Sequence, residues 1–176
     1  KQVDVVFFGR LIKRKNVIEI LNTLKKNDLK HISFKIYGEG PERNEIIKFK
    51  NKNKLKNVSI KNFLNNKKML KIIKTSKFTI NASNAEGLSN AILESLSVGV
   101  PVICRNISQN KELVKNGFNG YIFKNDNELE KIFKKINNLS NYKKISNNAY
   151  RTAKKYDIEA VTNSYINKYK NLLIKN

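Results

Sequence analysis

The chain has 176 residues, among them one cysteine, 36 basic and 14 acidic residues, and a chain of this length buries a hydrophobic core without disulfides or bound metal. No run of 18 apolar residues occurs, which argues against a transmembrane helix, and the first residues lack the pattern of a signal peptide. The single Cys104 excludes an internal disulfide and agrees with a reducing compartment, so we expect a cytoplasmic protein.

The net charge of +22 leaves two interpretations open. Between Glu45 and Glu86 there are eleven lysines and no acidic residue, which favours attraction to a polyanion, such as the anionic inner face of a membrane. Alternatively, the charge reflects a general bias in composition, because Lys, Asn and Ile are frequent throughout. Nucleic acid is disfavoured as a partner, since its sequence-specific readers rely on arginine forks and exposed aromatic residues, which are not concentrated here.

Short apolar runs alternate along the chain with longer amphipathic segments. The runs are mostly β-branched or aromatic, as in the buried strands of a parallel sheet. The predicted strands are 3–8, 32–37, 58–60, 78–82, 101–104 and 120–123, and the predicted helices between them are 16–26, 41–52, 66–75 and 89–98. After residue 123 the strands stop, and 127–137, 142–156 and 158–174 are predicted helices.

This alternation predicts an α/β fold with a Rossmann-like, doubly wound parallel sheet of about six strands and a helical C-terminal tail. Residues 1–176 would form a single domain. Because the sequence begins directly with a predicted core strand, two interpretations stay open, a full-length protein and a segment of a longer one.

In an open sheet of this kind, ligands bind outside the carboxyl ends of the strands. After the first strand, Gly9 allows a sharp turn, and the cations Arg10 and Lys15 can converge to neutralise a diphosphate; the alternative is a solvated basic loop. After the second strand, Gly38 and Gly40 let the backbone approach a ligand or a neighbouring loop, although a plain tight turn is the simpler explanation.

The segment from Glu86 to Glu94 is the most informative one. Eight helical residues separate the two acids by roughly 80° around the axis and up to ~12 Å along it, too far to share a proton. That span suits two separate hydroxyl-bearing rings with a phosphate between them, held by backbone N–H groups at a helix start. Those donors would belong to Gly87, Leu88, Ser89 and Asn90. A sugar, a diphosphate and a ribose in that order describe a nucleotide sugar; the alternative is a loop acid and a surface acid.

Together these pieces resemble the C-terminal domain of group 1 (family 4) glycosyltransferases, one half of the GT-B fold. The resemblance covers nearly the whole chain, and its motifs are specific through their order and spacing. They are Phe7-Phe8-Gly9-Arg10 through Lys15, Tyr37-Gly38-Glu39-Gly40-Pro41, the E-x7-E element from Glu86 to Glu94, Gly99-Val100-Pro101-Val102-Ile103, Glu112-Leu113-Val114 and Asn116-Gly117-Phe118-Asn119-Gly120-Tyr121.

The resemblance implies a retaining hexosyltransferase that moves a sugar from a nucleotide diphosphate sugar, with UDP favoured, to a glycan or lipid-linked acceptor. It implies that Arg10 and Lys15 contact the donor diphosphate, that Glu86 binds the transferred sugar, and that Glu94 binds the ribose. The segment around Leu64 would cover the base. No cofactor and no metal are expected, because basic side chains and a helix end replace the metal.

Three departures limit what the resemblance implies. The family usually has Gly where this chain has Asn16, which affects the turn more than the chemistry. Phe or Pro is common within the family's E-x7-E element, and its absence here leaves the sugar open. The N-terminal domain, which carries the acceptor site and usually a histidine, is absent from this chain; His31 is assigned no role. The alternative function is a non-catalytic basic module that docks to an anionic membrane or polyanion. A nucleotide-sugar epimerase fits the order of motifs less well.

Overall fold

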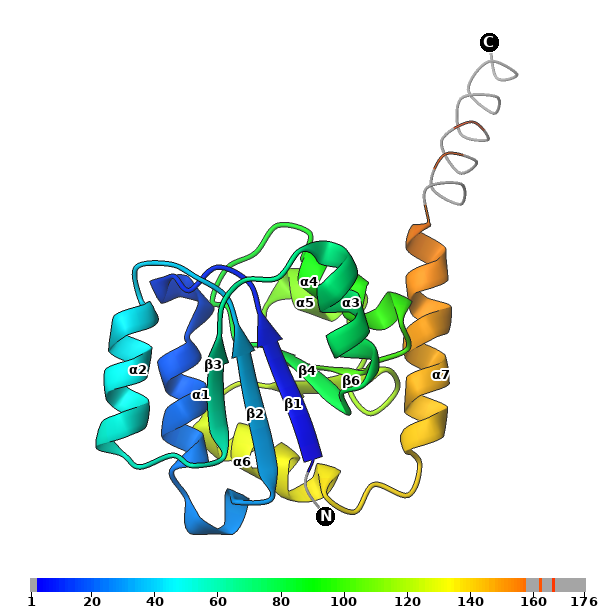
Figure 1. Cartoon of the computed structure of the whole chain (residues 1–176). Helices are drawn as coiled ribbons and strands as arrows, with labels where there is room; N and C mark the ends of the chain where they lie inside the picture. The colour runs from blue at the N-terminus through cyan, green and yellow to red at the C-terminus, as the bar shows by residue number, and fades with distance from the viewer. Residues whose placement is uncertain (1–2, 158–161, 163–165, 167–176) are drawn as a thin grey trace.

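The computed structural model describes residues 3–157 together with 162 and 166. Six parallel strands form one sheet in the order β3-β2-β1-β4-β5-β6 (Figure 1). They are β1 (Val3–Phe8), β2 (Ile32–Tyr37), β3 (Val58–Lys61), β4 (Phe78–Asn81), β5 (Val102–Arg105) and β6 (Gly120–Phe123). The strand order reverses between β1 and β4, so the loops after these two strands diverge around a crevice. The predicted fold class and all six predicted strands are confirmed.

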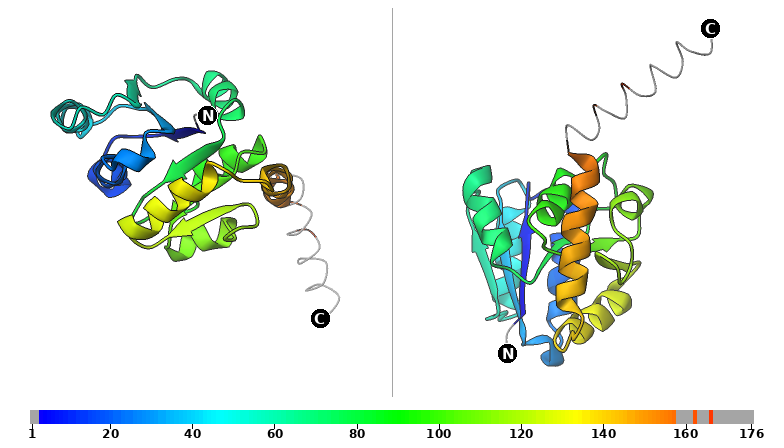
Figure 2. Two further views of the ribbon diagram at one scale, coloured as in Figure 1. Left: turned by 90° about the horizontal axis from the view of Figure 1, so that it is seen from below. Right: turned by 90° about the vertical axis from the view of Figure 1, so that its right-hand side faces the viewer.

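Helices cover both faces of the sheet (Figure 2). One layer contains α1 (Val17–Leu24), α2 (Arg43–Lys52) and α6 (Asp126–Ile136), and the other contains α3 (Asn66–Lys74), α4 (Asn90–Ser97), α5 (Ser108–Leu113) and α7 (Tyr142–Ala153). Short 3-10 turns occupy Lys13–Lys15, Asn27–Leu29 and Lys154–Tyr156. The predicted bounds differ from these by at most two residues, as is usual at helix ends, except that the predicted helix 142–156 takes in both α7 and the 3-10 turn after it.

One helix of the structure was not predicted, and one predicted helix lies mostly outside the described residues. The six-residue helix α5 was not predicted, because its polar sequence has no apolar period long enough to indicate a helix. The predicted helix 158–174 lies outside the described residues, apart from residues 162 and 166. Within the part of the chain that the structure describes, no helix combines the length and the apolar content that a bilayer crossing requires.

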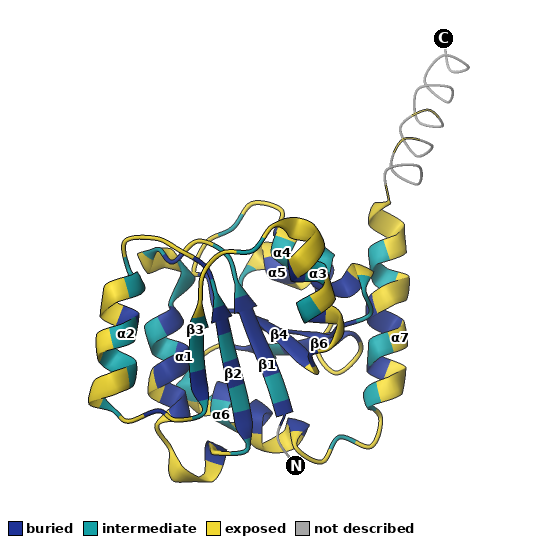
Figure 3. Cartoon of the chain, viewed as in Figure 1, coloured by how far each residue is buried: buried dark blue, intermediate teal, exposed yellow. Residues whose placement is uncertain are grey.

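The middle of the sheet is buried on both faces, and its strands are mostly apolar, whereas β2 alternates buried with half-buried residues and β3 has one buried residue (Figure 3). The largest fully buried side chains are Phe34, Phe78, Phe123 and Phe133. Every residue of β4 is buried, and Thr79 Oγ1 donates to Ser95 Oγ of α4 at 2.8 Å. Helix α4 also packs against α7. The start of α4 is therefore fixed over the carboxyl end of β4.

Candidate functional site

The loop after β1 presents a lysine on a strained but well-supported turn. Asn16 follows Lys15 and adopts the left-handed conformation, with φ 51° and ψ 38°. Asparagine tolerates this conformation better than other non-glycine residues, which explains how it replaces the glycine found at this place in the family it resembles. Its Nδ2 also donates to the carbonyl oxygen of Ala82 at 3.1 Å. Asn16 thus joins the β1 loop to the end of β4.

Lys15 and Glu86 meet directly across the crevice between the two loops. The Lys15 Nζ lies 2.5 Å from Oε1 of Glu86, and the two side chains are only 16% and 10% exposed. A backbone hydrogen bond from Asn84 N–H to the Arg14 carbonyl, at 3.0 Å, runs alongside this ion pair. The sequence predicted that these loops lie together, and the structure places the cation and the acid in contact.

The carboxylate of Glu86 is ionised at neutral pH. Burial raises the pKa of Glu86. The hydrogen bond and the charge of Lys15, together with the hydrogen bond from the Asn81 amide, lower this pKa by more than burial raises it, so the net shift is downward. Asn81 Nδ2 lies 3.3 Å from the same Oε1. The site therefore holds a fixed positive and a fixed negative charge side by side.

The start of α4 next to this pair presents unused backbone donors. Ser89 is its N-cap residue, and the backbone N–H groups of residues 87–91 make no hydrogen bond within residues 3–157. Unpaired N–H groups at a helix start bind anions, because the helix dipole adds to their partial charge. These donors include the four that the sequence predicted.

A cavity of about 340 Å³ opens on the α3 side of this helix start. It is lined by Phe8, Gly9, Tyr37, Phe63, Leu64, Asn66, Met69, Ala91 and Glu94. The lining is largely apolar, with Glu94 as its one acidic group. Burial raises the pKa of Glu94, with the Asn66 side chain acting in the opposite direction. Such a cavity suits a flat, mostly apolar ring next to a hydroxyl-bearing group.

The other predicted site residues lie around the same crevice. Leu64 lines the cavity and is partly buried, whereas the side chain of Leu88 is 59% exposed. Arg10 is exposed, and its guanidinium makes no hydrogen bond or ion pair within the described part of the chain. Around Gly87 no atom lies within 4 Å of where a Cβ would stand, so its backbone is open to a ligand.

Gly38 has a packing role. A Cβ at this position would stand 2.0 Å from the carbonyl oxygen of Gly9, so only glycine lets the two loops meet. Gly9 N–H donates to the Tyr37 carbonyl at 3.0 Å, and Leu11 N–H donates to the Glu39 carbonyl at 2.7 Å. The loop after β2 thereby supports the loop that carries Lys15.

Most of the chain matches a known family. The family model described as "Glycosyl transferases group 1" matches residues 1–156. The chain belongs to the group 1 glycosyltransferases. An uncharacterised glycosyltransferase of Methanocaldococcus jannaschii is 27% identical over 157 residues, covering 88% of this chain and 44% of the relative. The poly(glycerol-phosphate) alpha-glucosyltransferase of Bacillus subtilis is 30% identical over 164 residues, covering 89% of this chain and 24% of the relative.

Solved structures agree with this family on the fold. The chain superimposes on Anabaena Alr3699/HepE in complex with UDP-glucose with a TM-score of 0.83 and 18% sequence identity. That match covers 97% of this chain and 49% of HepE. This group 1 chain therefore spans about half or less of the length of these relatives.

Sequence reasoning missed one polar residue of this candidate site. Asn81 closes β4, is 5% exposed, and contacts both Glu86 and Ser89. The sequence signal that could have indicated Asn81 is an asparagine at the end of a predicted buried strand. Buried amides need hydrogen-bond partners, so such a residue is expected to bond to a neighbouring loop. By contrast His31, at the start of β2, has its ring nitrogens 3.0 and 3.1 Å from the carbonyls of Asp28 and Phe133, away from the site.

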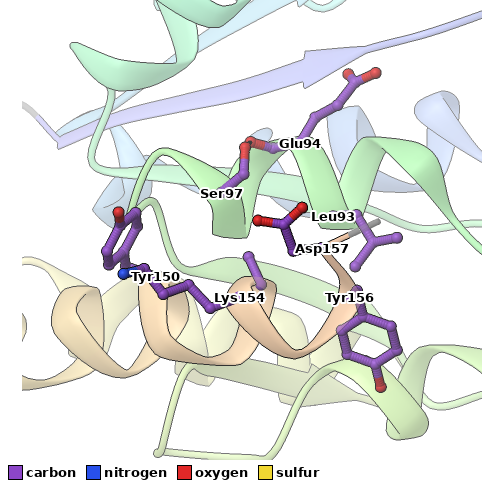
Figure 4. A pocket seen from close by; sticks show the side chains of 8 residues that line it. Leu93, Glu94, Ser97, Tyr150, Lys154, Tyr156 and Asp157 are labelled. Atoms are coloured by element: carbon purple, nitrogen blue, oxygen red, sulfur yellow. Dashed lines mark hydrogen bonds between the residues drawn. The ribbon is translucent and has the colours of Figure 1, made fainter. Parts of the chain in front are cut away.

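A second hollow of about 490 Å³ lies between α4 and the end of α7. It is lined by Leu93, Glu94, Ser97, Tyr150, Ala153, Lys154, Tyr156 and Asp157. Figure 4 shows that the carboxylate of Glu94 points away from Tyr150 and Tyr156. Glu94 thus forms the border between this hollow and the first cavity. Within residues 3–157, no group of three His, Cys, Asp or Glu side chains is placed to hold a metal ion.

Proposed function

We propose that the chain is the donor-binding half of a retaining glycosyltransferase that uses a nucleotide diphosphate sugar, with UDP as the favoured nucleotide. The observation that carries the proposal is the contact between Lys15 and Glu86 beside the open N–H groups at the start of α4. A cation and a helix start attract a diphosphate, and an acid next to them binds hydroxyl groups. The complex of HepE with UDP-glucose supports the same type of donor.

Each part of the site takes one part of the donor. The diphosphate lies against the N–H groups of residues 87–91, where Lys15 and Arg10 neutralise it. Glu86 accepts hydrogen bonds from the hydroxyls of the transferred sugar. The nucleoside occupies the cavity, with its ribose hydroxyls on Glu94 and its base near Leu64.

Catalysis in this proposal is stabilisation of a leaving group. When the bond between the sugar and the diphosphate breaks, negative charge grows on the phosphate oxygen. The open N–H groups at the start of α4, together with Lys15 and Arg10, would bind that oxygen more strongly as its charge grows, so they stabilise the transition state more than the ground state. This arrangement replaces a divalent metal. The acceptor attacks from the side on which the diphosphate leaves, so the anomeric configuration is retained.

The acceptor site belongs to an N-terminal domain outside this chain. The Bacillus relative is named for poly(glycerol-phosphate), which supports a glycan or lipid-linked acceptor of that general kind. Because half of the cleft is missing, the isolated chain should bind nucleotide and transfer sugar poorly. We propose a cytoplasmic location for the whole enzyme.

Isothermal titration calorimetry with UDP, GDP and their glucose conjugates tests the proposal. We expect the chain to bind at least one nucleoside diphosphate, and the Lys15→Ala variant to bind it at least tenfold more weakly. Lys124→Ala is the matched control, since Lys124 is exposed and lies after β6. A folded chain that binds none of these ligands would refute the donor-site assignment.

A second role, docking to an anionic membrane, is favoured by the placement of the lysines. The lysines of the acid-free segment 48–77 lie on α2, the edge strand β3, α3 and the loops that follow α2 and α3, and ten of the eleven are exposed. Their summed charge attracts anionic lipid over about one Debye length. Vesicle sedimentation with and without phosphatidylserine, at low and high salt, tests this role. Vesicle binding that does not depend on lipid charge or on salt would refute this role. Binding to anionic vesicles by a chain that binds no nucleotide would favour the alternative function, a non-catalytic module.

A further inference from the structure

One buried amide connects the two halves of the proposed donor site. Asn81 is the last residue of β4, and its Nδ2 lies 3.3 Å from Oε1 of Glu86 and 3.0 Å from Oγ of Ser89. Its Oδ1 accepts the N–H of Ser83 at 3.0 Å. With 5% exposure, Asn81 is beneath the surface of the site and uses both its donor group and its acceptor on the loop that carries Glu86.

The hydrogen bond to Ser89 changes what the helix start offers to a ligand. A serine at the N-cap ordinarily accepts a hydrogen bond from an N–H group in the first turn. Ser89 makes no such bond, and its hydroxyl oxygen instead accepts from Asn81. The N–H group of Ala91, which a serine cap would bond, consequently has no partner within residues 3–157. Ala91 also lines the cavity, so this residue lies next to the proposed donor.

We propose that Asn81 is a positioning residue of the donor site: it holds the Glu86 carboxylate toward Lys15 and draws the Ser89 hydroxyl away from the first turn of α4. This inference rests on the proposed function, because a diphosphate is the ligand that the free amides serve. Without Asn81, the Ser89 hydroxyl turns to the Ala91 N–H and caps the helix. The ligand then has to displace that cap before it binds.

A double-mutant cycle between the two residues tests the inference on the whole chain. UDP is titrated by calorimetry into the wild type, Asn81→Ala, Ser89→Ala and the double variant. We expect Asn81→Ala to weaken UDP binding about fivefold, the worth of a serine cap. In the double variant most of this loss should be recovered, because alanine at 89 lacks the hydroxyl but keeps the backbone N–H. A role limited to general stability gives no recovery.

Two further measurements make the outcome decisive. Asn81→Leu fills the same buried space without polar groups, and we expect the same loss and the same recovery by Ser89→Ala, which separates the effect from a cavity left by alanine. Thermal unfolding establishes that each variant is folded. If the wild type binds no nucleoside diphosphate, the proposed function fails and this inference falls with it. If the wild type binds, but either Asn81 variant binds equally well or Ser89→Ala restores nothing, the inference alone is overturned.

Discussion

The ion pair between Lys15 and Glu86 predicts that removing one negative charge strengthens nucleotide binding. In the structure, Glu86 forms an ion pair with the Lys15 ammonium group, which would bind the diphosphate in the proposed function. The negative charge of Glu86 would also repel a second anion nearby. Glu86→Gln keeps the size of the side chain and removes the charge. We therefore expect the variant to bind UDP more tightly than the wild type does.

The size of the gain follows from the geometry of the pair. Lys15 Nζ and Glu86 Oε1 are 2.5 Å apart, and both side chains are mostly shielded from water. The Gln amide oxygen still accepts from the charged ammonium group, so the variant loses only the charge–charge part of the pair, which is about 1 kcal/mol for exposed pairs and larger where both side chains are shielded from water. Replacing the carboxylate by an amide thus makes Lys15 about 1.4 kcal/mol more available to phosphate, which corresponds to about tenfold in Kd.

Calorimetry with UDP and with UDP-glucose is the assay. Glu86→Gln should bind UDP about tenfold more tightly and gain less for UDP-glucose, since in the proposed function Glu86 also binds the sugar hydroxyls. Glu94→Gln is the control in the opposite direction, because the proposed function places the ribose on Glu94, and its loss should then weaken both ligands. Equal or weaker UDP binding by Glu86→Gln would contradict this interpretation of the pair.

Three further predictions concern the supporting structure. Gly38→Ala should lower the free energy of unfolding by about 1–3 kcal/mol in urea titrations, because its Cβ meets the Gly9 carbonyl, whereas Gly87→Ala, with open space around it, should leave stability nearly unchanged. Burial raises the pKa of Glu94, so this carboxyl favours the folded state only at low pH and loses that effect as the pH rises through the raised pKa. Glu94→Gln should therefore raise Tm by about 1–3 °C at pH 7 and leave Tm unchanged at pH 3.5. An equal rise in Tm at both pH values would contradict an upward shift of this pKa. Burial raises the pKa of the Cys104 thiol to about 12, so a thiol reagent at pH 8 should label the chain only in denaturant; rapid labelling of folded protein would refute this.

The strands and most helices were predictable because local pattern determines them. A sheet buried on both faces needs continuous apolar runs, and helices that cover it need one apolar face, so both leave a periodic signal in the sequence. The helix α5 left none, since only two of its six residues, Asn110 and Leu113, are buried.

The site was predictable in its position and less so in its contacts. The topology rule places the loops after β1 and β4 at one edge, which brings Lys15 near Glu86 although 71 residues separate them. Which side chains touch depends on rotamers and long-range packing, and no local pattern encodes these. For this reason the roles of Asn81 and of the Asn16 amide became visible only in the structure, and Gly38 gained a packing role that a lone glycine motif does not reveal.

The central claim is that Lys15, Glu86 and the start of α4 form one diphosphate site, and an NMR titration tests it most directly. UDP is added to ¹⁵N-labelled chain while backbone amide shifts are followed. The account predicts that the largest changes fall on the amides of residues 87–91 and on Gly9, and that they are lost in Lys15→Ala. Changes confined to other elements, such as α2 or α6, would contradict it.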